Sequence, residues 1–189
     1  GIAMAITRDE AVILLNKYIK NERMLNHCYA SEAVMMALAR RLGRDEEKWG
    51  IAGLLHDLDV ELVNADLSIH GKETEKILKE KGIEPEIIEA IVMHNETFTG
   101  KKRHSELQHA LAAGETITGL IVATTLVYPD KKIASVKQKS VVKRMKEKAF
   151  AASVNRDNIM ECEAIGIPLS EFVEISINAM KDISDQLGL

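Results

Sequence analysis

The chain has 189 residues, of which 46% are hydrophobic and 4% aromatic, and its formal net charge is −4. A chain of this length buries roughly 70% of the surface that its unfolded form exposes, so it needs no disulfide staples. Its longest apolar stretch, 119–128, is too short to span a bilayer, and no basic, apolar leader opens it. Two isolated cysteines, Cys28 and Cys162, are typical of reduced thiols. We expect a soluble, cytoplasmic protein with no membrane partner.

Capping residues and helical spacing predict an all-α fold along the whole chain. Thr7 and Glu10 have the spacing of a capping box, as do Ser105 and Gln108. Apolar residues then recur at steps of three and four. The expected helices span about 8–20, 21–43, 45–57, 72–81, 85–94, 105–128, 140–150, 155–166 and 168–187. With no linker or repeat, we expect one domain over 1–189, with a helical core at about 22–128 and a helical tail at about 129–189.

A histidine–aspartate doublet ends the third expected helix. His56 and Asp57 directly follow the apolar run 51–55, where burying an imidazole and an ionised carboxylate is costly unless something compensates both. A divalent metal ion does so. Adjacent helical residues diverge by ~100°, so the two side chains can share one ion only near a helix end. His27 lies on the preceding helix. Spacing alone leaves a metal site and a structural pair equally open.

Glu115 is the one charge in an otherwise uncharged, mostly apolar stretch of the long helix. Gly114 and Gly119 flank it, and a glycine inside a helix costs ~1 kcal/mol relative to alanine. Two such positions beside one carboxylate suggest close packing around a site. A polar residue at a helix–helix contact is the alternative.

In this order, His27, His56 with Asp57, and Glu115 resemble the HD superfamily of metal-dependent phosphohydrolases, over about residues 22–128. Segments 112–121 and 150–156 resemble a narrower group of bacterial HD/HDIG-type hydrolases. The resemblance implies a compact HD-domain helical bundle with a C-terminal helical extension, and a metal ion held by these four residues. Glu115 stands where the family usually has Asp, which implies a shifted ion or a different carboxylate geometry.

Two further histidines match the two-metal branch of the family. His70 opens segment 70–75, and His94 ends the run 91–94. The resemblance implies a second ion at His70 and His94, with Asp57 as a bridge. That branch includes diadenosine tetraphosphate hydrolases and cyclic-dinucleotide phosphodiesterases, but the chain lacks a GYP signature, which argues against the latter. One or two ions are expected, and the mixed N/O donors suit Fe, Mn, Co, Ni or Zn better than Mg or Ca.

The activity that the resemblance implies is hydrolysis of a phosphate ester or nucleotide by metal-activated water. The enzyme would be a phosphomonoesterase, phosphodiesterase or nucleotide pyrophosphohydrolase. Asp57 would serve the chemistry directly, and Asp59 and Glu61 are candidates for proton transfer. A basic run is the candidate for gripping the substrate phosphate: Lys101, Lys102 and Arg103. Each of these charges could equally be an ordinary loop charge.

Alternatives come from other functional classes. Some HD proteins that hold two irons are oxygenases, and others have lost ligands and act as regulatory binding modules. All core ligand positions are filled here, which argues against the latter. Segment 131–148 carries eight basic residues and one acidic residue, a net +7 against −11 for the rest. It lacks interleaved aromatic residues, so nucleic acid is not favoured. The expected partner is a small, nucleotide-like phosphorylated substrate, and a homodimer stays open.

Overall fold

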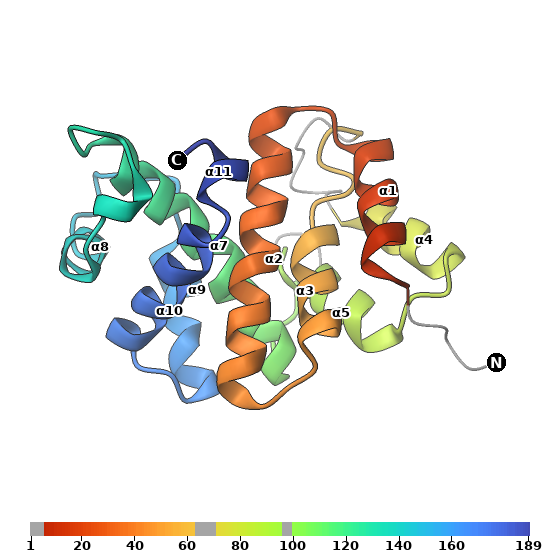
Figure 1. Cartoon of the computed structure of the whole chain (residues 1–189). Coiled ribbons are helices and arrows are strands. Elements are labelled where there is room, and N and C mark those ends of the chain that lie inside the picture. The colour runs from red at the N-terminus through yellow and green to blue at the C-terminus, as the bar shows by residue number, and fades with distance from the viewer. Residues whose placement is uncertain (1–5, 63–70, 96–99) are drawn as a thin grey trace.

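The computed structural model describes residues 6–62, 71–95 and 100–189, and these residues form helices and turns with no strand, as the sequence predicted. Figure 1 shows α2 crossing the middle of the molecule, with α1, α3, α4 and α5 on one side and α8 to α11 on the other. The α-helices are α1 (Arg8–Tyr18), α2 (Glu22–Leu42), α3 (Glu46–Leu55), α4 (Lys72–Glu80), α5 (Pro85–Met93), α7 (Glu106–Leu126), α8 (Gln138–Met145), α9 (Arg156–Met160), α10 (Leu169–Lys181) and α11 (Ser184–Leu187). Two short 3-10 helices complete the described chain, η1 (Ile133–Ser135) and η2 (Glu161–Ile165).

Local capping explains where the first helices begin. Side chains of Thr7, Asn21 and Asp45 each accept a hydrogen bond from a backbone N–H in the first turn of α1, α2 and α3. Ser105 and Gln108 form a reciprocal capping box at the start of α7. Gly43 ends α2 with φ of 70°, a left-handed conformation that favours glycine. These signals are local, and for this reason the sequence located the first helices to within about two residues.

Two glycines let the neighbouring helices approach α2 closely. A Cβ atom at Gly53 of α3 would lie 2.6 Å from the backbone oxygen of Ser31 on α2. A Cβ atom at Gly114 of α7 would lie 3.0 Å from the Met35 sulfur, also on α2. α2 is therefore packed between α3 and α7, and its contact with α3 at Gly53 is one that only a missing side chain permits. This packing brings together the faces that carry His27, His56 and Glu115.

The tail differs from the expected helices because Arg156 organises it. The expected helix 140–150 runs instead from Gln138 to Met145, and turns follow it. The Arg156 guanidinium donates to backbone oxygens of the turns between α8 and α9, those of residues 144, 147, 150, 151 and 154. Expected helix 155–166 is split into α9 and η2, and the last helix is split into α10 and α11.

The structure contains no helix, in the part of the chain that it describes, with the length and apolar character needed to cross a bilayer. The core is instead distributed between the helices. Most of its largest fully buried side chains come from α1 to α5, α7 and α10, among them Leu15, Met35, Leu54, Leu111 and Phe172. Burial on both sides of α2 fixes the helices that carry the histidines.

We expect Gly53→Ala to lower the free energy of unfolding by about 1–3 kcal/mol, because the new methyl group overlaps a backbone atom that cannot rotate away. Gly119→Ala is the matched control. Its Cβ would meet only the Val154 Cγ2 atom at 3.4 Å, and alanine is ~1 kcal/mol more favourable in a helix. Urea denaturation of both variants measures the difference. Equal stabilities would show that α2 and α3 are not in backbone contact.

Candidate metal centre

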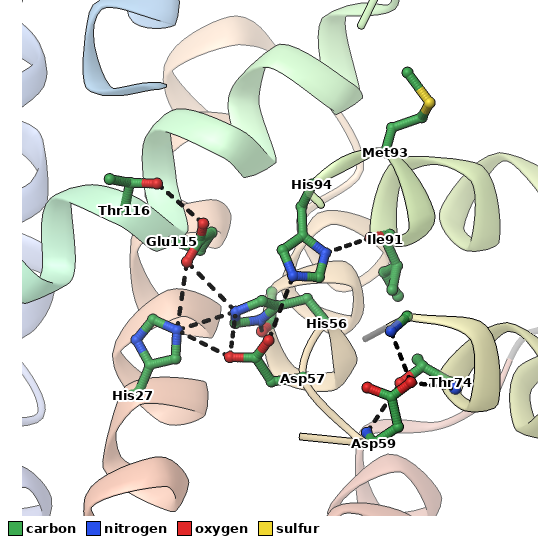
Figure 2. Close-up of polar contacts among 12 residues, drawn as sticks. His27, His56, Asp57, Asp59, Thr74, Ile91, Met93, His94, Glu115 and Thr116 are labelled. Carbon is green, nitrogen blue, oxygen red and sulfur yellow. Dashed lines mark hydrogen bonds and ion pairs between the residues drawn. The ribbon is translucent and has the colours of Figure 1, made fainter. Parts of the chain in front are cut away.

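Side chains from four helices converge on one point beside α2. His27 comes from α2, His56 and Asp57 from the end of α3, His94 from the end of α5, and Glu115 from α7 (Figure 2). His27 Nε2 lies 3.0 Å from His56 Nε2 and 3.3 Å from Asp57 Oδ2. Ligand atoms of these three residues all lie within 4.8 Å of one another. The arrangement has the dimensions of a metal centre.

The histidine–aspartate doublet can share this point because α3 ends there. α3 ends at Leu55, and His56 is its C-terminal cap. The chain then turns, so that His56 Nε2 and Asp57 Oδ2 lie 3.1 Å apart instead of diverging around a helix. The His56 side chain is fully buried, and that of Asp57 is 10% exposed. The helix end expected from the sequence thus lies at the required position.

Glu115 closes the cluster from the opposite helix. Its Oε2 lies 3.5 Å from His27 Nε2 and 3.7 Å from His56 Nε2. Its Oε1 instead accepts a hydrogen bond of 2.9 Å from the hydroxyl of Thr116. Only one carboxylate oxygen is therefore directed at the imidazoles. The longer side chain of Glu115 thus reaches both imidazoles with one oxygen and Thr116 with the other.

Hydrogen bonds on the far side of each ring fix which nitrogen carries a proton. His56 Nδ1 lies 2.7 Å from the Gly53 carbonyl oxygen, which can only accept. His27 Nδ1 lies 3.0 Å from the Thr118 hydroxyl, whose own hydrogen is donated to the Glu115 carbonyl oxygen. The hydroxyl must therefore accept from His27. Both Nδ1 atoms are donors, and the two Nε2 lone pairs face each other across 3.0 Å.

Two facing lone pairs beside two carboxylates require a positive charge between them. Without a metal ion, protons supply it. Burial alone lowers the pKa of His27, but hydrogen bonds to Asp57 and Glu115 raise it above its ordinary value. Burial also opposes protonation of His56, yet its pKa lies well above the ordinary value because of the charges of Asp57 and Glu115. Burial would raise the pKa of Glu115, but hydrogen bonds from both histidines lower it.

The donor set fits a divalent transition-metal ion. Two imidazole nitrogens with lone pairs and two carboxylate oxygens form a mixed N/O set, which suits Fe, Mn, Co, Ni or Zn. The oxygen atoms that hold each Nδ1 are the outer partners that metal-bound histidines normally have. An ion would replace the protons that otherwise neutralise the cluster.

His94 approaches the other side of Asp57. Its Nε2 lies 3.4 Å from Asp57 Oδ1, and its Nδ1 contacts the Ile91 carbonyl oxygen. Asp57 therefore directs one oxygen at His27 and His56 and the other at His94 (Figure 2). This is the geometry that a bridging carboxylate needs. His70, the other residue expected at a second ion, lies outside the described residues.

The two proton-transfer candidates hold helix starts instead of entering the cluster. Asp59 is fully buried, and its Oδ2 accepts backbone hydrogen bonds from Gly71, Glu73 and Thr74 at the start of α4. Glu61 accepts from the backbone N–H groups of residues 20 and 21 at the start of α2. Orphan N–H groups at a helix start bind a carboxylate strongly. These contacts give both acidic residues a structural role at a helix start, and their part in proton transfer stays a prediction.

The expected phosphate grip is divided by burial. Lys101 and Lys102 are exposed, whereas Arg103 is buried and its side chain is only 2% exposed. Arg103 forms a two-pronged ion pair with Glu161 of the tail. Its guanidinium is therefore not directed at the cluster or at open solvent.

Sequence reasoning missed Thr118 and an adjacent cleft. Thr118 lies three residues after Glu115 on α7, the spacing of side chains on one helix face, and this could have identified it. A cleft of about 440 Å³ lies between α2, α7 and the tail, with His27 and Thr118 in its wall. Arg23 lines the cleft as well, and most of the remaining described lining is apolar.

Comparison with protein-family models matches residues 24–125 to the HD domain, a match that covers more than half of the chain. The matched range contains all five residues of the cluster in Figure 2. Neither the curated proteins nor the solved structures contained a match to the chain.

We expect Thr118→Val to weaken metal binding by roughly 10–100-fold, because it removes the oxygen that holds His27 in the metal-ready tautomer. Thr125→Val is the matched control, since that buried hydroxyl on the same helix bonds only to a backbone oxygen. Calorimetric titration of both variants with Mn²⁺ checks this. Equal affinities would show that Thr118 does not support the centre.

The metal-free protein should lose stability as the pH rises above about 6.5, the ordinary histidine value. The pKa values of His27 and His56 are raised by folding, so their contribution is present below 6.5 and is lost as the pH passes through the folded values. Glu115, with its lowered pKa, contributes above its ordinary 4.5 and loses this contribution on acidification. The window of full contribution is therefore pH 4.5–6.5.

Urea denaturation of metal-stripped protein at pH 6 and pH 8.5 measures this change. His27→Gln should flatten the profile, and added Mn²⁺ should reverse its slope, because metal binding needs deprotonated imidazoles. If the stability of metal-free wild-type protein were the same at pH 6 and pH 8.5, His27 and His56 would not carry the protons that we assign to the cluster.

Proposed function

Because the chain belongs to the HD domain family, we propose that it is a metal-dependent phosphohydrolase that acts on a small phosphate ester or nucleotide. The single observation that carries the proposal is the pair of Nε2 atoms 3.0 Å apart, with both Nδ1 protons committed elsewhere. A histidine pair with only a structural role would not need two carboxylates beside two opposed lone pairs. A site that binds a cation needs both, because these atoms supply its ligands.

In this proposal, His27, His56, Asp57 and Glu115 hold one ion, and His94 with the second oxygen of Asp57 reaches a second. His70 is retained as a proposed ligand of that second ion. When bound, a divalent ion in such a site supplies a water of lowered pKa and an electrophile for phosphoryl oxygens. Low exposure of the His56, Asp57 and His94 side chains limits their contact with water, which strengthens charge interactions on that side of the site.

The cleft beside His27 supports a small substrate. Its volume of about 440 Å³ is in the range of ligand pockets, and it shares His27 and Thr118 with the centre. A substrate whose phosphate lies at the centre would place its organic part there. Arg23 offers the cleft a positive charge, and the exposed Lys101 and Lys102 remain proposed contacts for the phosphate.

A metal and substrate panel tests the activity. Metal-stripped protein would be loaded separately with Mn, Fe, Co, Ni and Zn and assayed on generic phosphoesters and nucleotides. Phosphate release in any arm supports the proposal. Oxygen consumption with an iron-loaded sample, together with a mixed-valent absorption band and no phosphate release, would instead favour an oxygenase. Metal binding with neither reaction would favour a regulatory module.

We expect Asp57→Ala to lower turnover by orders of magnitude while the fold stays intact, because it removes carboxylate oxygens from both sides of the centre. Asp157→Ala, which changes an exposed carboxylate of α9, is the control. Turnover, metal content and thermal midpoint are measured on each. Near-normal turnover after loss of metal would place the chemistry elsewhere, and unfolding would make Asp57 a structural residue.

A further inference from the structure

Arg103 lies at the junction of three elements that surround the metal centre. It belongs to the segment between α5 and α7, and its side chain is 2% exposed. Its Nε donates to Glu161 Oε1 at 2.8 Å, and its Nη2 pairs with Glu161 Oε2. A guanidinium held by a two-pronged carboxylate has a fixed plane and position. Because the Arg103 guanidinium is buried and its plane is fixed, it can set the distances between the helices that it contacts.

One arm of Arg103 reaches the helix end that carries His94. Its Nη1 donates a hydrogen bond of 3.0 Å to the Met93 carbonyl oxygen. Met93 is the last residue of α5, and His94 follows it directly as the cap. A carbonyl at a helix end has no partner within its own helix, and a cation there is favourable. Arg103 therefore fixes the end of α5 from which the His94 ring projects towards Asp57.

A second arm leads to Glu115. Arg103 Nη2 donates to Asn158 Oδ1 at 2.9 Å. The Asn158 amide lies 3.5 Å from the Thr116 hydroxyl, and this hydroxyl donates to Glu115 Oε1. Through these links the carboxylate is held by Oε1, which leaves Oε2 for the imidazoles.

The ion pair also anchors α7 itself. Glu161 Oε1 lies 2.8 Å from His109 Nδ1, two turns of α7 before Glu115. The Arg103–Glu161 pair thus contacts α5, α7 and the start of η2 at once. Two of the metal-centre residues, His94 and Glu115, lie on elements that this pair joins.

We propose that Arg103 is a positioning residue of the metal centre, which sets the distance of His94 from Asp57 and that of Glu115 from the imidazoles, with Glu161 as its counterion. The inference rests on the metal centre of the proposed function but not on hydrolysis. In this proposal positioning takes the place of the expected substrate grip, because the Arg103 guanidinium donates to Glu161, Asn158 and the Met93 carbonyl.

Metal affinity tests the proposal without reference to turnover. Purified full-length Arg103→Lys would be titrated with Mn²⁺ by calorimetry. Lysine keeps the charge but loses the planar fork, so we expect binding to weaken by roughly 10–100-fold. Arg41→Lys is the matched control, because Arg41 forms a similar two-pronged pair with Glu171 on the exposed surface. It should bind Mn²⁺ as wild type does.

A substrate contact predicts a different result. If Arg103→Lys binds Mn²⁺ normally and only raises KM, Arg103 contacts substrate and the proposal is overturned. If no arm of the metal and substrate panel released phosphate, the proposed function would be wrong. The proposal for Arg103 would not be affected, because Mn²⁺ affinity is measured without any reaction. If Arg103→Lys does not fold, the double variant Arg103→Met with Glu161→Gln replaces it, because both charges are then removed together. Weaker Mn²⁺ binding by the double variant would support the proposal, and normal binding would overturn it.

The Glu115 arm has its own pair of variants. Thr116→Val keeps the side-chain shape but loses the hydroxyl, so Mn²⁺ binding should weaken, and Thr116→Ser should restore it. Nuclear magnetic resonance of the histidine Nε2 atoms in metal-free protein should show a larger change from wild type for Thr116→Val than for Thr116→Ser. Normal Mn²⁺ binding by Thr116→Val would remove Glu115 from the proposal and overturn it in its stated form.

Discussion

The rest of the structure depends on one constraint. The Nε2 atoms of His27 and His56 lie 3.0 Å apart with their lone pairs opposed. Such a contact repels unless a cation lies between the atoms, and each ring must be prevented from turning its N–H inward. The Gly53 carbonyl prevents this for His56, and the Thr118 hydroxyl for His27. Gly53 has a second role, since its missing side chain lets α3 touch the α2 backbone. For His56, the packing of α3 and the position of the ring proton are thus set by the same turn of helix.

Charge in the cluster also determines what its neighbours can do. Cys28 directly follows His27, yet burial, with Asp57 and Glu115 nearby, raises its pKa well above the ordinary value. In the metal-free chain this favours the protonated thiol. The ligand atoms brought together in the cluster are therefore imidazole nitrogens and carboxylate oxygens. A mixed N/O set of this kind is one that borderline transition-metal ions accept.

The sequence predicted the helices up to residue 126 and the members of the cluster because both leave local signals. Caps lie within one turn of the groups they satisfy, and the doublet lies at a helix end that the apolar run predicts. Long-range contacts leave no such signal. Asp59 and Glu61 are acidic residues in a turn, and only the folded chain shows that they cap α4 and α2. Arg103 likewise looks like a solvated loop charge until Glu161, 58 residues later, is placed against it.

The Arg103–Glu161 pair also bears on the domain organisation. The two charges lie on opposite sides of residue 125, where the match to the HD domain ends. Arg103 falls inside the matched range 24–125, whereas Glu161 and Asn158 lie in the tail. Removing one partner of a buried pair leaves an uncompensated charge, at a cost of roughly 3–5 kcal/mol. That is a large part of the stability of a typical domain. In our proposal the tail supplies the counterion of a residue that positions the centre, and on this ground we propose that the core and the tail fold as one unit.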